Sequence, residues 1–445
     1  MSQKPIRVVV CDDSSTVRRI IRRCLKDLDD IEVVGEAKDG IEVLPLIREL
    51  EPDLLTLDIE MPQQDGLSTL AQLKREGVRL PVIMISTLTH RGAAITLEAL
   101  SRGASEYIAK PSNVGSLNEA LDLVRAQLVP KIRGLTEHLR RPPRPATPLP
   151  KAPSAPTPLM TKPTPAPRPS RPSSAPSRSA EPALLNLAAK RKRSLLATPA
   201  PLKSSRTLTP AKPKPVRATP APSLKRAPRP ALRVGQHRIV VIAVSTGGPN
   251  AITQLLSALP GSFPVPILVV QHMPAPFTQL LAERLDERCA LTVREGYAGG
   301  LVEPGTVWIA PGGFHMVPQK TESGVMLAIN QDPPENSCRP AADPMFRAAT
   351  EIYGSQVLGV VMTGMGQDGL VGSQHIKATG GEVIVQDESS SVVWGMPGAV
   401  VGANLADGIF SLDQLAREMS TRVSQQKGRG ASQGRTSIAE AAGQS

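Results

Sequence analysis

The chain has few cysteines and no long apolar run, and these absences argue against several classes of protein. Its four cysteines, Cys11, Cys24, Cys289 and Cys338, are widely scattered and form no CxxC pair. This spacing argues against a disulfide framework and against a structural zinc site. No stretch approaches the roughly 18 apolar residues of a membrane span, and the N-terminus lacks a signal peptide's basic and apolar regions. We therefore expect a cytoplasmic protein with no membrane insertion.

Aromatic and acidic side chains are missing from one long segment. Residues 141–230 hold 24 prolines, nineteen Lys and Arg, one acid, Glu181, and no aromatic residue. The segment carries a net charge of +18, so the rest of the 445-residue chain carries −6 of the overall +12. The basicity therefore gives no argument that the folded parts bind nucleic acid, and the segment offers no rings on which bases could stack.

The composition predicts two domains, because 445 residues are too many for one compact core. We expect a first domain over 1–130, a disordered Pro/Ala/basic linker over 131–232, a second domain over 233–427 and a disordered tail over 428–445. One part of the linker, Leu184–Ala197, lacks proline and could form a short basic helix. A solvated, disordered stretch is the favoured alternative there.

The first domain alternates strand-like and helix-like patterns. Helical three-and-four spacing of apolar residues separates the first two runs, and strict alternation predicts a parallel, doubly wound α/β sheet. The predicted strands are Ile6–Cys11, Glu32–Gly35, Leu54–Asp58, Val82–Ser86 and Tyr107–Ala109.

Polar side chains stand where these predicted strands end. Asp12 and Asp13 follow the first strand, Asp58 ends the third, Ser86 ends the fourth, and Lys110 follows the fifth. Because parallel strands end at one edge of the sheet, these side chains should converge. Clustered carboxylates favour a hard cation such as Mg²⁺. Asp58 could then attack phosphorus and form an acyl phosphate, with Lys110 neutralising the phosphoryl oxygens.

This domain resembles a response-regulator receiver domain. The matching segments are CDDS, LDIEMPQQDG, ISTLT and YIAKP. The resemblance implies a CheY-like fold with Asp58 as the phosphorylation site. It also implies Mg²⁺ residues at Asp12 and Asp13 and switch residues at Ser86 and Tyr107.

The second domain opens on a sharp turn in the segment IVVIAVSTGGP, residues 239–249. Its apolar run is typical of a strand buried on both faces, and Pro249 suits the first turn of a helix. Ser245 would lie at the carboxyl end of that strand, with Gly247 and Gly248 allowing the tight turn. A serine that only caps the helix is the alternative.

The α/β alternation continues to about residue 422, as in a Rossmann-like sheet. The further predicted strands are Ile267–Gln271, Val307–Ala310, Val357–Thr363 and Glu382–Gln386, and the helices are Phe277–Leu285, Pro344–Tyr353 and Leu370–Thr379.

A nucleophilic serine needs a base, an orienting acid and an oxyanion hole. His272 follows a predicted strand and should reach the same edge as Ser245, so we favour it as the base, with His315 as runner-up. Asp368 follows another strand through the turn GMGQDG, whose backbone N–H groups could bind an oxyanion. A helix N-cap is the alternative role for Asp368.

The whole chain resembles the CheB family of chemotaxis response-regulator protein-glutamate methylesterases. The segments VSTGGP, VVQHMP, APGGFHM, RPAADPMF, TGMGQDG and WGMPGAV carry the resemblance in the second domain. It implies Ser245 as nucleophile, His272 as base and Asp368 as orienting acid. It also implies the Met365 N–H as oxyanion donor, with Thr246 beside the site.

Two positions depart from the family pattern. Ala243-Val244 stands where Gly-Ala is common, and Cys338 stands where another residue, often His, precedes Arg-Pro.

The resemblance implies a phosphorylation-activated esterase that demethylates glutamates, and deamidates glutamines, on the cytoplasmic domains of chemoreceptors. A chemotaxis histidine kinase would be the phosphodonor, Mg²⁺ would serve the receiver, and the esterase would need no cofactor. We further expect that the unphosphorylated receiver covers the catalytic edge. The alternative is a phosphorylation-controlled binding protein with an inactive hydrolase domain.

Overall fold

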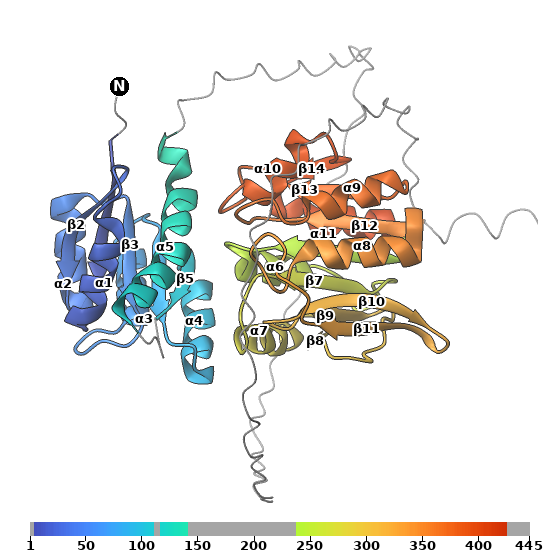
Figure 1. The fold of residues 1–445 in the computed structure, drawn as a ribbon, viewed down its shortest axis with the longest axis horizontal. Coiled ribbons are helices and arrows are strands. Elements are labelled where there is room, and N and C mark those ends of the chain that lie inside the picture. The colour runs from blue at the N-terminus through green and yellow to red at the C-terminus, as the bar shows by residue number, and fades with distance from the viewer. Residues whose placement is uncertain (1–3, 111–115, 141–236, 425–445) are drawn as a thin grey trace, which may run out of the picture. The chain divides into compact units, whose positions relative to one another are not determined.

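The computed structural model describes residues 4–110, 116–140 and 237–424 of the chain. They form two α/β domains, each built on a parallel sheet (Figure 1). This confirms the predicted fold class. The proline-free segment Leu184–Ala197, for which a disordered stretch was favoured over a short helix, and the tail after residue 427 lie outside the described residues. Among the described helices, none is both long and apolar enough to cross a membrane.

The first domain has five parallel strands in the order β2-β1-β3-β4-β5. Their residues are apolar and mostly buried, because helices cover both faces of the sheet. The strands are β1 Ile6–Cys11, β2 Ile31–Ala37, β3 Leu54–Asp58, β4 Val82–Ser86 and β5 Glu106–Ala109, and the helices are α1 Ser15–Leu25, α2 Gly40–Leu50, α3 Gly66–Arg75, α4 His90–Arg102 and α5 Leu117–Arg140.

Helix α5 extends through residues 131–140, so the first domain ends beyond the expected boundary at residue 130. The reason is apolar spacing: Leu128, Ile132 and Leu135 are buried in the same core as α1. Pro130 lies inside the helix. Burial of this apolar stripe outweighs the loss of one backbone hydrogen bond at the proline.

The second domain has seven parallel strands in the order β14-β13-β12-β6-β7-β9-β8. An antiparallel hairpin, β10-β11, forms a separate two-stranded sheet that the sequence analysis did not predict. The strands are β6 Ile239–Val244, β7 Ile267–Gln271, β8 Thr292–Glu295, β9 Thr306–Ile309, β10 His315–Thr321, β11 Gly324–Asn330, β12 Val357–Val361, β13 Glu382–Gln386 and β14 Gly408–Phe410, and the helices are α6 Gly248–Ser257, α7 Phe277–Asp286, α8 Ala342–Tyr353, α9 Leu370–Ala378, α10 Gly395–Gly402 and α11 Leu412–Ser424.

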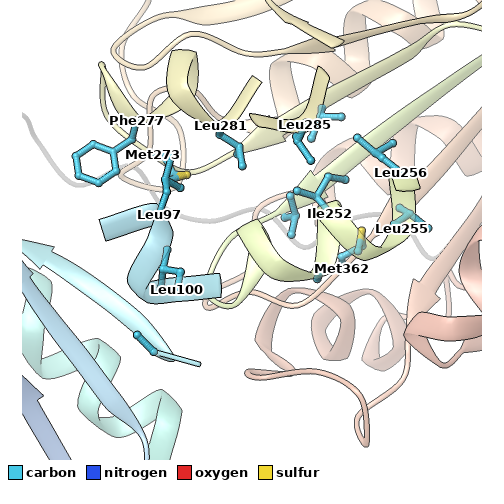
Figure 2. Close-up of a cluster of buried hydrophobic side chains, with 14 of the residues drawn as sticks. Leu97, Leu100, Ile252, Leu255, Leu256, Met273, Phe277, Leu281, Leu285 and Met362 are labelled. Atoms are coloured by element: carbon cyan, nitrogen blue, oxygen red, sulfur yellow. The ribbon is translucent and has the colours of Figure 1, made fainter. Parts of the chain in front are cut away.

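Alternate residues of β6 face two different cores. Val240, Ile242 and Val244 belong to the cluster that includes α6, α7 and α11, whereas Val241 and Ala243 belong to the cluster of α8, α9 and α10. Figure 2 shows the first cluster, in which side chains of α6 and α7 gather over the sheet. Burial on both faces fixes the register of β6 in the sheet, and this sets the position of the turn that follows it.

Candidate active site

The turn after β6 is held from both sides by hydrogen bonds. The Ser245 N–H donates to Thr363 O at 3.0 Å, and Gln271 Nε2 donates to Ser245 O at 2.9 Å. Thr363 Oγ1 also donates to the carbonyl of the buried Thr246. Gly247 adopts the left-handed φ of +75° at which the chain turns into α6. Ser245 itself is only partly buried.

Three neighbouring strands bring the predicted residues to one edge. Strand β6 lies between β12 and β7, and Ser245 follows β6 while His272 follows β7. Asp368 follows β12 through its glycine-rich turn. His272 Nε2 lies 2.7 Å from Asp368 Oδ2, so the base and acid expected from sequence are paired. The chain order reverses at β6, which is where open α/β sheets bind ligands.

Asp368 is a buried, ionised carboxylate. Burial works to raise its pKa, but the hydrogen bond with His272 and donors on the backbone hold the pKa below its usual value. The N–H groups of Ala342 and Asp343 donate to it at 2.6 and 3.1 Å. Asp368 therefore does cap a helix, as the alternative proposed, but the helix is α8 rather than α9, which follows it in the chain. The two roles share Oδ2, which accepts from the Ala342 N–H and also pairs with His272, whereas Oδ1 accepts from the Asp343 N–H. They are compatible, because each carboxylate oxygen can accept more than one hydrogen bond.

The imidazole of His272 favours its protonated form. Burial opposes the charge, but the hydrogen bond with Asp368 and contact with Cys338 raise the pKa of His272 to about 10. Cys338, noted from the sequence as a departure from the family pattern, thus contacts the imidazole directly.

His315, the runner-up base, is occupied by the backbone. Its Nδ1 accepts from the Ala341 N–H, and its Nε2 lies 3.2 Å from Pro333 O. The ring is only 1% exposed. With both nitrogens engaged, His315 ties β10 to the segment before α8. The geometry therefore favours His272.

Met365 and Gly364 approach the serine from the β12 side. A Cβ on Gly364 would lie 2.8 Å from the Ser245 Cβ, so only glycine allows this approach. The next residue, Met365, presents its thioether to Gly134 of α5, where an added Cβ would lie 3.2 Å from Sδ. The backbone of Met365, the predicted oxyanion donor, is thus carried into the neighbourhood of Ser245.

Three residues around the site were not singled out from the sequence. Gln271 supports the serine turn, while Asn336 and Asp343 hydrogen-bond with each other and surround Asp368. Only Gln271 had a local signal, because it ends a strand directly before His272. Asn336 and Asp343 depend on contacts that are distant in sequence.

The receiver edge also gathers its predicted residues. Lys110 Nζ lies 2.7 Å from Asp58 Oδ2 and 3.3 Å from Asp12 Oδ2. Burial and the charge of Asp12 raise the pKa of Asp58 to about 6. Asp58, Ser86 and Lys110 line one small cavity. The Ser86 hydroxyl accepts from Thr96 Oγ1 at 2.6 Å.

The acidic cluster fits a divalent cation. Oxygens of Asp12, Asp13 and Asp58 lie within 4.8 Å of one another. Burial raises the pKa values of Asp12 and Asp58 although the Lys110 ammonium opposes the shift, so an added cation would favour their ionised forms. An oxygen-only set of this kind suits Mg²⁺.

Helix α4 of the first domain packs against α6 and α7 of the second domain. The ring of Tyr107, the predicted switch aromatic, stacks on Phe277 with centroids 4.6 Å apart. Arg284 of α7 pairs with Glu98 of α4 at 3.3 Å. The receiver therefore contacts the catalytic domain through Tyr107, its predicted switch residue on β5, and through α4.

Comparison with known proteins finds matches for both domains. The family model "CheB methylesterase" matches residues 240–419, and the "Response regulator receiver domain" matches residues 8–122. A protein-glutamate methylesterase/protein-glutamine glutaminase of Trichodesmium erythraeum is 40% identical over 94% of this chain and 99% of its own. The chain belongs to the CheB methylesterase family. A Nocardioides relative with the same name is 38% identical over 95% of this chain and 96% of its own. The solved catalytic domain of Thermotoga maritima CheB is 41% identical and covers 41% of this chain and 97% of its own, with a TM-score of 0.41.

The two histidines should respond differently to substitution. His315→Asn should keep kcat within about tenfold of wild type and lower the free energy of unfolding by about 1–3 kcal/mol, because it loses buried hydrogen bonds. His272→Asn should remove nearly all ester hydrolysis. Steady-state kinetics and thermal unfolding of both variants test this. Loss of activity in a folded His315→Asn protein would instead make His315 the base.

Proposed function

We propose that this chain is a phosphorylation-activated protein-glutamate methylesterase of chemoreceptors, with Ser245, His272 and Asp368 as its catalytic residues. The observation that carries the proposal is the 2.7 Å His272–Asp368 pair at the sheet edge where Ser245 follows β6. The substrate would be a γ-glutamyl methyl ester on the cytoplasmic domain of a receptor. The same chemistry on a glutamine side chain would release ammonia in place of methanol.

The reaction follows from the arrangement of donors. Asp368 engages Nε2 of the imidazole, so Nδ1 is the nitrogen that takes the Ser245 proton. Ser245 Oγ attacks the ester carbonyl, and the N–H of Met365 stabilises the oxyanion. His272 returns its proton to the methoxy group, and methanol leaves an acyl-enzyme. A water molecule, deprotonated by His272, then releases the glutamate carboxylate and frees Ser245.

Control would come from the receiver. Asp58 would accept a phosphoryl group from a histidine kinase, with Asp12, Asp13 and Asp58 holding Mg²⁺. The cation would supply charge neutralisation of the phosphoryl oxygens, as Lys110 also does. Contacts of Met365 with α5 and of Arg284 with α4 support the idea that the unphosphorylated receiver limits access to Ser245.

Removing the nucleophile tests the assignment most directly. Ser245→Ala should lower methanol release from methylated receptor by about 10⁴-fold or more, because no other hydroxyl replaces it in the acyl-enzyme step. Ser257→Ala, on the exposed side of α6, is the matched control and should behave as wild type. Wild-type turnover in Ser245→Ala would end the proposal. An inactive wild-type chain that still binds receptor would favour the binding-protein alternative.

The pH dependence of the esterase should report His272. Because the charge of Asp368 raises the pKa of His272, kcat/KM should rise with pH as the imidazolium loses its proton. Asp368→Asn removes that charge, so the rising limb should move to lower pH while kcat falls by about 10⁴-fold. Asp413→Asn on α11 is the control. A rising limb that stays in place would show that Asp368 does not set the imidazole pKa.

The contact between the domains should restrain basal activity. Arg284→Glu places a like charge opposite Glu98 and should raise unphosphorylated methanol release about two- to fivefold, the range expected for one partly exposed ion pair. The charge-swapped double variant, Glu98→Arg with Arg284→Glu, should return toward the wild-type rate. Rates are compared with and without a small phosphodonor. Equal basal rates in all three proteins would contradict restraint through this contact.

A further inference from the structure

The helices α8 and α9 both begin without a cap of their own. The N-cap positions are Ala341 and Gly369, and neither provides a side-chain hydrogen bond to its helix. A helix start leaves several backbone N–H groups without intrahelical partners, and burial makes such groups costly. Both starts are buried here, so their donors must be satisfied by other parts of the chain.

Two aspartates satisfy these donors reciprocally. Asp368, which precedes α9, accepts from the N–H groups of Ala342 and Asp343 at the start of α8. Asp343, which lies in α8, accepts from the N–H groups of Gly369 and Gly372 at 3.0 and 2.7 Å. Each helix is therefore capped by a carboxylate from the other. The positive ends of both helix dipoles converge on this pair of charges.

Asn336 joins the two carboxylates. Its Nδ2 donates to Asp343 Oδ2 at 2.9 Å and to Asp368 Oδ1 at 3.0 Å. The residue lies in an exposed turn and has a left-handed φ of +51°, followed by Ser337 at +62°. Asparagine tolerates this conformation better than most residues. The turn is tied to α8 by the ion pair between Glu335 and Arg347.

The bridge also balances charge. Asp343 and Asp368 are both 1% exposed, and two adjacent carboxylates disfavour joint ionisation. Burial raises the pKa of Asp343 to about 6, and the charge of Asp368 adds to this shift. The Asn336 amide, an N–H donor to both, favours the ionised forms. The other ionisable groups around the pair are His272, Cys338 and the Glu335–Arg347 ion pair.

We propose that Asn336 and Asp343 are positioning residues of the esterase: Asn336 favours the ionised form of Asp368, and both residues hold its carboxylate aimed at His272. The proposal rests on the function proposed above. Neither residue touches the reacting atoms. Asp343 acts through the backbone at the starts of both helices, and Asn336 acts through its two amide hydrogen bonds.

The test separates the amide donors from the shape of the turn. Asn336→Asp keeps the size of the side chain and its tolerance of positive φ but loses the N–H donors at neutral pH. Asn336→Ala loses both shape and donors. Each should lower kcat about tenfold or more with KM nearly unchanged, the effect expected for lost hydrogen bonds to a charged group. Ser337→Ala, in the same turn, is the matched control and should keep the wild-type kcat.

A readout without substrate completes the experiment. NMR titration of the full chain, labelled at histidine, should show a lower pKa for His272 in Asn336→Ala, because the Asp368 carboxylate is then less firmly held beside the imidazole. Thermal unfolding checks that each variant is folded. A wild-type kcat in Asn336→Asp, or an unchanged His272 pKa in Asn336→Ala, would overturn the proposal. If the wild-type chain releases no methanol yet the His272 pKa still shifts, the proposed function fails and the positioning role stands.

Discussion

Two buried carboxylates at two helix starts hold this site together. Asp368 caps α8, and Asp343, which lies in α8, caps α9. The relative positions of the two helices are therefore fixed by the same carboxylates that surround the imidazole of His272. Removing either charge would leave buried N–H groups without acceptors, and a buried orphaned donor costs about 1–3 kcal/mol. The stability of this corner of the domain and the orientation of His272 therefore depend on the same hydrogen bonds.

The positions of Ser245, His272 and Asp368 could be predicted because each follows a run that is apolar on both faces. Such runs predict parallel strands, and parallel strands end at one edge. The register of the strands determines which residues are neighbours at this edge. Val244 of β6 pairs with Gln271 of β7, so the next residues along the two strands, Ser245 and His272, are also neighbours. Sequence reasoning left His315 as a second candidate base. Only the structure shows that both of its nitrogens bind the backbone.

What the sequence could not predict are contacts that local patterns do not encode. A helix cap is normally sought next to its own helix, but Asp343 caps α9 from 26 residues away. Asn336 lies in a polar turn, where asparagine is common, so the sequence gives no sign that its amide donates to two carboxylates. The hairpin β10-β11 was missed because Pro318 and polar residues interrupt its first strand. The first domain also extends beyond the boundary expected at residue 130, because the apolar spacing of α5 continues past Pro130.

The energies of these contacts indicate which kind of control this architecture favours. Asp368 is engaged by His272, Asn336 and three backbone N–H groups. Distorting it would leave a buried charge incompletely paired, which typically costs about 3–5 kcal/mol. The contacts between the domains include a partly exposed ion pair, worth about 0–1 kcal/mol, and one ring stack, worth about 0.5–1.5 kcal/mol beyond its burial. Loosening the contacts between the domains would therefore cost a phosphorylated receiver less than rearranging the surroundings of Asp368. A site whose acid is this rigid is best regulated by access.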